Sequence, residues 1–181
     1  VLRMGALDSE DRVNLAIVYR LGQEAAHLDD RKYRATAAFS YFSSVVLWVV
    51  QAGRNDGSKL ISHQAAKLYL DNAEYTLILD ALPDSVESAG MEETTVAEFL
   101  IWIRNCLAHV NSGEIRGWNV DGELKGFEFS SGGKMIRMKR RDMQNVVKSV
   151  CYDYCNLVGT FADIPFEEIA LDAYHFEDRD E

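Results

Sequence analysis

The residues with the clearest chemical potential lie together in the segment 104–109, which reads RNCLAH. Arg104 carries a permanent positive charge on a planar fork of donors, and His109 can take up or release a proton near neutral pH. Asn105 adds a polar amide. Such a set suits phosphodiester cleavage in RNA, because the histidine can move a proton between the 2′-hydroxyl and the leaving oxygen while the arginine stabilises charge on the phosphorane. This chemistry requires no metal ion and no other cofactor.

Spacing alone does not establish a site at these residues. Positions five apart on a regular helix diverge by about 140°, and helices contain arginine–histidine pairs by chance. In the alternative interpretation, Arg104 reaches solvent and His109 pairs with an acid such as Glu98. Other catalytic patterns do not occur in the sequence, including the G-x-S-x-G elbow, the glycine-rich phosphate loop and the H-E-x-x-H metal pair.

The segment 95–110 is predicted to be the helix that positions these residues. Thr95 and Glu98 form a T-x-x-E capping box, and the small residues at 111–113 indicate the helix end. One face of this helix is ordinary apolar core. A second stripe, with Ile101 beside it, carries polar groups and one large aromatic: Glu98, Trp102, Asn105 and His109. A helix that is apolar on two sides must be covered on both.

The rest of the chain is predicted to be mainly helical. Apolar periodicity and helix stops place four further helices, at about 9–27, 31–52, 58–81 and 142–159. After residue 113 the period changes to that of strands, with glycine turn signals at 121–122 and 132–133. The expected fold is therefore a mainly α bundle of about five helices with a small antiparallel β insertion of two or three strands at about 115–139.

Length and charge indicate one folded domain followed by an acidic tail. The chain has 181 residues, 48% of them hydrophobic, which is enough for a single core over residues 1–160. Residues 161–181 hold eight of the 29 acidic residues and one of the 19 basic residues, so the net charge of −10 falls to −3 over the body. The acidity of the whole chain therefore does not argue against an RNA-binding body.

Cysteine usage and hydropathy predict a soluble, cytoplasmic protein. Cys106, Cys151 and Cys155 form no C-x-x-C pair and have no zinc-ligand spacing with histidine, so we expect reduced, buried thiols and no metal site. The apolar run 45–50 is too short to cross a bilayer, and the start of the sequence has no apolar leader. No membrane association is expected.

A basic cluster follows the second glycine turn and comprises Lys134, Arg137, Lys139, Arg140 and Arg141. Strand alternation places Arg137 and Lys139 on one face, as a surface that tracks an RNA backbone requires. Exposed basic residues on an edge strand also prevent aggregation, so this alternative stays open. Three aromatic residues nearby could stack bases or cover the inner face of the sheet: Trp118, Phe127 and Phe129.

The segment RNCLAH, at the end of a buried helix and followed by a turn of small residues, resembles the R-x4-6-H motif of the HEPN superfamily in its R-N-x-x-A-H form. The resemblance covers the motif helix closely and the helical layout loosely. It implies an HEPN-like helical domain that forms a homodimer through its motif helices, whose composite cleft cuts RNA without metal and leaves a 2′,3′-cyclic phosphate. It also implies Arg104 as the phosphate binder, His109 as the acid/base and Asn105 as their polar support.

The same resemblance offers a reason for the second stripe of the motif helix, because Glu98, Ile101 and Trp102 would form the dimer contact. The expected function is a metal-independent endoribonuclease of the HEPN type in a toxin–antitoxin or phage-defence setting. RNA is the expected substrate, and an antitoxin or regulatory protein is an expected partner. The alternative is a non-catalytic HEPN-like dimeric module that binds a partner protein or a nucleotide, in which Arg104 and His109 hold the dimer.

Overall fold

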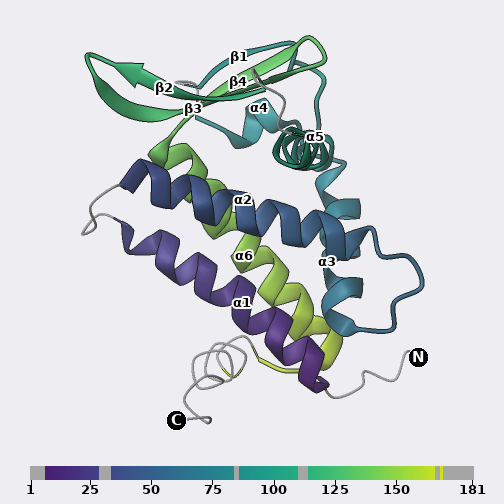
Figure 1. Cartoon of the computed structure of the whole chain (residues 1–181). Helices are drawn as coiled ribbons and strands as arrows, with labels where there is room; N and C mark the ends of the chain where they lie inside the picture. The colour runs from purple at the N-terminus through teal and green to yellow at the C-terminus, as the bar shows by residue number, and fades with distance from the viewer. Residues whose placement is uncertain (1–6, 29–33, 84–85, 110–113, 166–167, 169–181) are drawn as a thin grey trace.

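The computed structural model describes residues 7–28, 34–83, 86–109, 114–165 and 168. Within these ranges the helices are α1 (Ser9–Ala26), α2 (Arg34–Gly53), α3 (Ile61–Ala73), α4 (Ile78–Ala81), α5 (Val96–Ala108) and α6 (Arg140–Ala162). The strands are β1 (Glu87–Ala89), β2 (Ile115–Val120), β3 (Glu123–Ser131) and β4 (Lys134–Lys139). The sheet caps one end of the molecule, α5 lies beneath it, and α1, α2, α3 and α6 form the helical layer (Figure 1).

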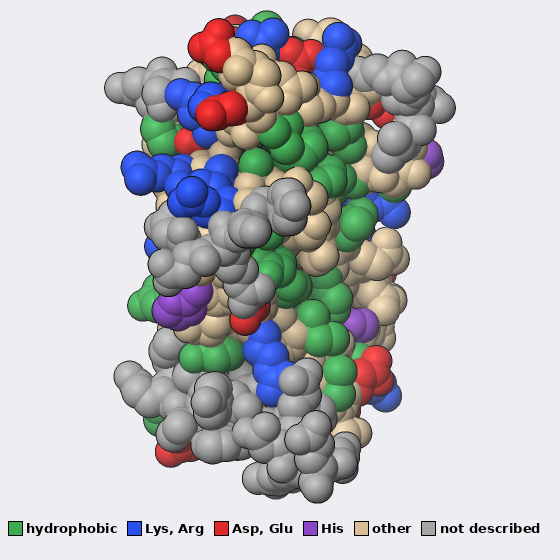
Figure 2. All heavy atoms as spheres, turned by 60° about the vertical axis from the view of Figure 1, so that its left-hand side comes forward, with side chains coloured by type: hydrophobic (Ala, Val, Ile, Leu, Met, Phe, Trp, Pro, Cys, Tyr) green, Lys and Arg blue, Asp and Glu red, His purple; other side chains and the backbone are tan. Residues whose placement is uncertain are grey.

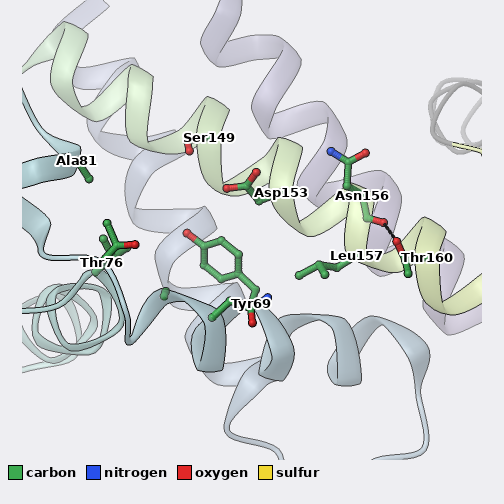
Figure 3. A pocket seen from close by; sticks show the side chains of 11 residues that line it. Tyr69, Thr76, Ala81, Ser149, Asp153, Asn156, Leu157 and Thr160 are labelled. Atoms are coloured by element: carbon green, nitrogen blue, oxygen red, sulfur yellow. Dashed lines mark hydrogen bonds between the residues drawn. The ribbon is translucent and has the colours of Figure 1, made fainter.

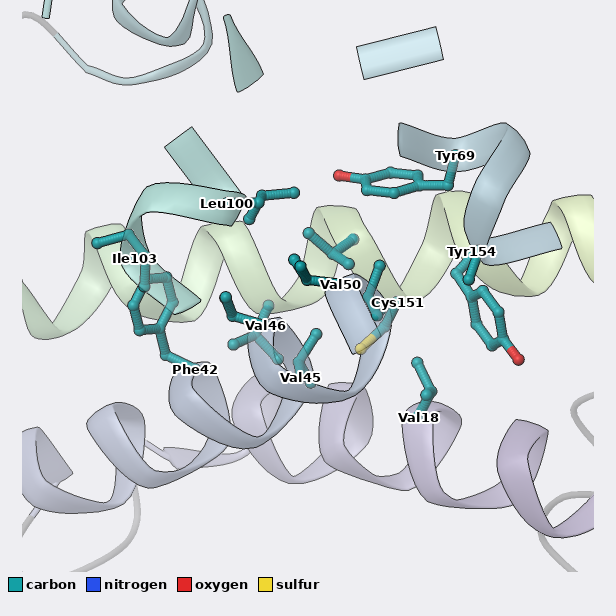
Figure 4. Packing of buried hydrophobic residues seen from close by; sticks show 14 of the residues in the cluster. Val18, Phe42, Val45, Val46, Val50, Tyr69, Leu100, Ile103, Cys151 and Tyr154 are labelled. Atoms are coloured by element: carbon teal, nitrogen blue, oxygen red, sulfur yellow. The ribbon is translucent and has the colours of Figure 1, made fainter. Parts of the chain in front are cut away.

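The core is centred on α2. Its valines Val45, Val46 and Val50 are buried and meet side chains from α1, α5 and α6 (Figure 4). Because fully burying a side chain of this size contributes about 1.5–3 kcal/mol, these valines are a large part of what holds the helices together. Gly22 on α1 allows a close helix contact, since a Cβ there would lie 2.8 Å from Cys151 Cβ on α6.

The helix predicted at 58–81 is divided into two. Helix α3 ends at Ala73, and Leu77 forms an isolated antiparallel bridge with Thr95 before α4 begins. The amide of Ile78 donates to the carbonyl of Thr94 at 2.8 Å, and the amide of Val96 donates to the carbonyl of Thr76 at 2.8 Å. These bonds satisfy the free amide at the start of α5, so a tertiary contact replaces a local helical turn.

The start of α3 is also set by a distant residue. Ser58 was the expected beginning of this helix, but the helix begins at Ile61. The N-cap residue is Leu60, whose side chain cannot form a capping hydrogen bond. The buried carboxylate of Asp11 on α1 accepts hydrogen bonds from the amides of Ile61 at 3.3 Å and Ser62 at 2.7 Å. An acidic side chain from another helix therefore caps α3.

The four strands form one antiparallel sheet in the order β1-β4-β3-β2. The hairpins β2–β3 and β3–β4 arise from the stretch in which strands were expected. Strand β1, by contrast, lies between the helices expected at 58–81 and 95–110, where no strand was expected, and it pairs with β4 through Glu87–Arg137 and Ala89–Met135. One strand of the sheet therefore precedes α5 in the sequence and the other three follow it.

The expected bundle of about five helices with an HEPN-like layout and a β insertion confined to about 115–139 is therefore wrong. The described part of the chain has six helices and a four-stranded antiparallel sheet, and is mainly α with a sheet. The expectation failed because β1 is only three residues long and has no apolar alternation, so its pairing with β4 leaves no local signal. Helix α6 continues to Ala162, past the expected domain limit at residue 160.

The inner face of the sheet packs on the first half of α2. The rings of Phe39 and Phe127 stack with centroids 4.3 Å apart, and Phe42 and Phe129 meet at 5.8 Å. Phe127 and Phe129 therefore cover the inner face, as one of the two interpretations predicted. Gly117 pairs with Phe127 and therefore shares the inner face. Trp118 is the next residue along β2, and successive strand residues point to opposite faces, so Trp118 lies on the outer face.

Helix α2 is long and apolar enough to span a membrane when judged by length and composition alone. In the structure this helix contributes many core residues, with Ala38, Phe42 and Val49 fully buried, although Leu47 is exposed. A buried central helix of this kind passes the same test, so the finding is weak evidence for a membrane segment.

Candidate functional site

Helix α5 is formed as its sequence predicts. The hydroxyl of Thr95 accepts a bond from the amide of Glu98 at 3.2 Å, and the carboxylate of Glu98 accepts one from the amide of Thr95 at 2.9 Å. The predicted capping box is thus confirmed. Phe99, Leu100 and Ile103 are buried beneath the helix, which fixes the rotation that presents Arg104 and Asn105 at the surface.

Arg104 is held by two neutral amide side chains. Its Nη1 donates to Asn105 Oδ1 at 3.2 Å, and its Nη2 donates to Gln51 Oε1 on α2 in a longer bond of 3.4 Å. Within the described ranges, no carboxylate forms an ion pair with Arg104. Because amides orient a guanidinium without neutralising it, the positive charge of Arg104 remains available to an anion.

His109 stands at the point where α5 ends. It is the C-cap, with φ −119° and ψ 51°, and its amide donates to the carbonyl of Asn105 at 3.0 Å. Its side chain is exposed. Because this amide bond is the helical one to the residue four back, the Cα of His109 keeps its helical position, and no contact joins its side chain to Arg104 in the described part of the chain. Residues 110–113, with the predicted helix stop, lie outside the described residues.

Glu98 lies too far along the helix to be the simple partner of His109. Eleven residues, or about three helical turns, separate them, and the Glu98 carboxylate is engaged in the capping box. The predicted polar stripe nevertheless exists, because Glu98 and Asn105 are exposed and Trp102 is half-buried between them. The pairing of His109 with Glu98, one of the alternatives from the sequence, has no support in this geometry.

The predicted dimer residues have contacts within the chain. The indole N–H of Trp102 donates to the carbonyl of Ser131 on β3 at 3.2 Å, and its ring lies 6.4 Å from that of Phe99. Ile101 is half-buried and packs against the core. Trp102 therefore helps to attach the sheet to α5, and a dimer contact would use the part of these side chains that remains accessible.

Gln51 also lines a pocket beside Arg104. This cavity of about 400 Å³ lies between α2 and α3, and its walls include Trp48, Asn55 and His63. The ring nitrogen Nδ1 of His63 lies 2.8 Å from Ser58 Oγ and 3.3 Å from Asn55 Nδ2. The pocket combines an aromatic wall with amide and imidazole groups. Neither Gln51 nor His63 was expected at the site, because nothing in the sequence links them to Arg104.

Arg137, a member of the predicted RNA-binding cluster, is paired with acidic side chains. Arg137 lies between two carboxylates, with Nε at 2.8 Å from Glu128 and Nη1 at 2.7 Å from Glu87. Glu128 also pairs with Arg116 at 3.3 Å. These four residues are in register across all four strands, so their charges alternate over the outer face of the sheet. Figure 2 shows acidic and basic side chains side by side at this end of the molecule.

The other basic residues are dispersed. Lys134 Nζ donates to Thr94 Oγ1 at 2.8 Å on the side of the sheet that faces α5. Lys139 shares the outer face with Arg137, as predicted, and both cations lie over the ring of Trp118 at 5.9 and 5.6 Å. Arg140 and Arg141 begin α6. The cluster is therefore contiguous in sequence but divided between the two faces of the sheet and a helix start.

The three cysteines are free and buried, as expected. Cys106 lies on the buried side of α5, and burial raises the pKa of its thiol to about 11. Burial likewise raises the pKa of the Cys155 thiol to about 12. Thiols with such pKa values are poor nucleophiles near neutral pH, so Cys106 is a packing residue within the motif helix. In the described part of the chain, no three His, Cys, Asp or Glu side chains converge as a metal site would require.

Another cavity has no residue of the motif among its walls. It occupies about 450 Å³ between α3 and α6, where Tyr69, Ser149 and Asp153 face the same space (Figure 3).

Comparison with known proteins places the chain in no family. No protein-family model matches it, and neither the curated proteins nor the solved structures include a match.

Proposed function

We propose that the protein is a metal-independent endoribonuclease that uses Arg104 and His109. The observation that carries the proposal is the position of the Arg104 guanidinium, which Asn105 and Gln51 orient through neutral oxygens. Arg137 provides the contrast, because two glutamates already neutralise it. Of these two arginines, Arg104 is the one prepared to receive a phosphate.

His109 supplies the proton transfer in this proposal. Its imidazole is exposed at the C-cap of α5, where it can reach a bound substrate. The 2′-oxygen attacks phosphorus while its proton moves to a base, and the P–O5′ bond breaks as the 5′-oxygen receives a proton. The products are a 2′,3′-cyclic phosphate and a free 5′-hydroxyl. Arg104 stabilises the negative charge that develops on the phosphorane.

The pocket beside Gln51 supports RNA as the substrate. Its volume of about 400 Å³ admits a nucleobase, Trp48 offers an aromatic surface, and Asn55 and His63 offer hydrogen-bonding groups. A phosphate on Arg104 and a base in this pocket would use adjacent parts of one surface, because Gln51 belongs to both. The resemblance of RNCLAH to the HEPN motif supports the same reaction, and a homodimer through α5 belongs to the proposal.

Labelled single-stranded RNA provides the test, with EDTA present throughout. We expect cleavage by the wild-type chain, products that end in a 2′,3′-cyclic phosphate, and no cleavage of a strand that has 2′-deoxyribose at the cut position. Arg104→Ala should abolish the reaction, whereas Arg54→Ala, which removes an exposed arginine just after α2, should not. RNA that is bound but never cut by the wild-type chain would overturn the proposal and favour a non-catalytic binding module.

A further inference from the structure

The groove between α3 and α6 has two compartments. The cavity of about 450 Å³ continues into a second one of about 390 Å³, because Tyr69, Ala81, Val96 and Ser149 line both. Neither cavity includes Arg104, Asn105, His109 or Gln51. The groove is therefore a separate feature of the fold from the candidate ribonuclease site.

Most of the side chains that line one compartment carry a polar group, and one of them is charged. In Figure 3 the hydroxyls of Tyr69 and Ser149 and the carboxylate of Asp153 point into the same space. Among the residues that line either cavity, all of them in the described ranges, Asp153 is the only charged one. No ion pair to Asp153 forms within the described part of the chain, so its charge is not neutralised there. Partial burial raises the pKa of Asp153, as expected for a carboxylate at the edge of a groove.

Most of the side chains that line the other compartment are apolar, with Asn145 and Ser149 among the polar ones, and this compartment reaches the motif helix. Its walls include Ile78, Leu82 and Val146, together with Phe99 and Leu100 of α5. The hydrophobic effect favours a carbon-rich group at this end, and the lone carboxylate favours a cation at the other. Tyr69 lines both compartments. Its buried side chain forms the wall against which an elongated ligand would lie.

We propose that this groove is a binding site for a small amphipathic amine. The ammonium group pairs with Asp153 and donates to the hydroxyls of Tyr69 and Ser149, while an aromatic or aliphatic body occupies the compartment against Phe99 and Leu100. Charge complementarity selects the amine over a carboxylate of the same shape, and the apolar compartment selects it over ammonium itself. The inference does not depend on the proposed ribonuclease activity.

Calorimetric titration of the full chain with 2-phenylethylamine tests the proposal. Two ligands of matched size serve as controls, the neutral 2-phenylethanol and the anionic 3-phenylpropanoate. We expect saturable binding of the amine at pH 7, binding of the alcohol that is about fivefold weaker, and still weaker binding of the anion. Equal binding of all three ligands, or no saturable binding of the amine, would overturn the proposal.

Two variants locate the binding. Asp153→Asn should weaken the amine about fivefold and leave the alcohol unchanged, while Asp71→Asn changes an exposed acid on α3 outside the groove and should alter neither. Ser149→Trp places a large side chain at an exposed position shared by both compartments and should remove binding of amine and alcohol alike. Unchanged amine affinity in folded Asp153→Asn or Ser149→Trp protein would refute the site.

Discussion

Arg104 on α5 and Gln51 on α2 are joined by a hydrogen bond of 3.4 Å between Nη2 and Oε1, although 53 residues separate them in the sequence. The bond is long and its own contribution to stability is modest. Its importance is that the acceptor is an amide. A carboxylate at the same position would hold Arg104 more firmly and would also compete with a phosphate for it.

Gln51→Glu should therefore impair RNA cleavage more than Gln51→Ala does. The isosteric carboxylate forms an ion pair with Arg104 and lowers its affinity for phosphate, whereas alanine removes only a weak bond. We expect a loss of about tenfold or more in kcat/KM for glutamate, in line with the 1.5–3 kcal/mol of a charged hydrogen bond. Initial rates on labelled RNA measure it. Gln23→Glu, an exposed change on α1, should cleave as the wild type does, and equal rates for both Gln51 variants would contradict the explanation.

His109→Ala should abolish cleavage and leave the fold intact. The imidazole is exposed at the end of α5 and supports no core contact, so the free energy of unfolding should stay within about 1 kcal/mol of the wild type. Urea unfolding and RNA cleavage with EDTA, measured on the same preparation, check both parts. A variant that still cuts RNA would exclude His109 as the acid/base, and His63→Ala would then be the next variant to measure.

Arg104→Ala and His109→Ala chains should complement each other if the site is shared between two protomers. A mixed dimer has one side with both residues intact and should recover part of the wild-type rate. Native mass spectrometry verifies the mixed dimer, and Ile101→Glu, at the accessible edge of α5, should prevent its formation. Wild-type protein that stays monomeric at micromolar concentration and still cuts RNA would remove the composite site from the mechanism.

Stability should fall in alkaline solution as the buried thiols ionise. Burial raises the pKa of Cys106 from 9.0 to about 11, so the folded chain holds this proton more tightly than the unfolded chain does. The resulting contribution to stability is complete below about pH 9 and is lost as the pH rises through about 11. Urea unfolding across this range measures the slope. Cys106→Ala should show a shallower decline, and an identical slope would mean that other groups cause the loss.

Glu128→Gln should expose positive charge on the outer face of the sheet. Glu128 pairs with both Arg116 and Arg137, and it is the least exposed member of the alternating row. Its loss should lower the melting temperature more than Glu87→Gln does, because two arginines lose a partner instead of one. If Arg137 contributes to RNA binding at all, Glu128→Gln should also tighten RNA binding at low salt, which filter binding can measure. Unchanged binding would exclude Arg137 from the RNA surface.

Elements whose signals are local could be predicted from the sequence. The capping box Thr95–Glu98 and the apolar spacing of Phe99, Leu100 and Ile103 predict α5 and its buried side, because a helix cap and a helical period each depend on residues within a few positions. The same reasoning located the β2, β3 and β4 strands through alternation and glycine turns. Burial of the three cysteines followed from their apolar context.

Contacts between distant segments could not be predicted in this way, because they depend on how the elements pack. The start of α3 depends on Asp11 of α1, the break before α4 depends on Thr94 and Thr76, and β1 exists because β4 offers it a partner. In each case a polar group forms its hydrogen bond with a residue far away in the sequence. Local periodicity and residue propensity contain no information about such a partner. The candidate site shows the same division, since Arg104, Asn105 and His109 stand out in the sequence. Gln51, which accepts a hydrogen bond from Arg104 without neutralising it, is brought to it only by the packing of α2 against α5.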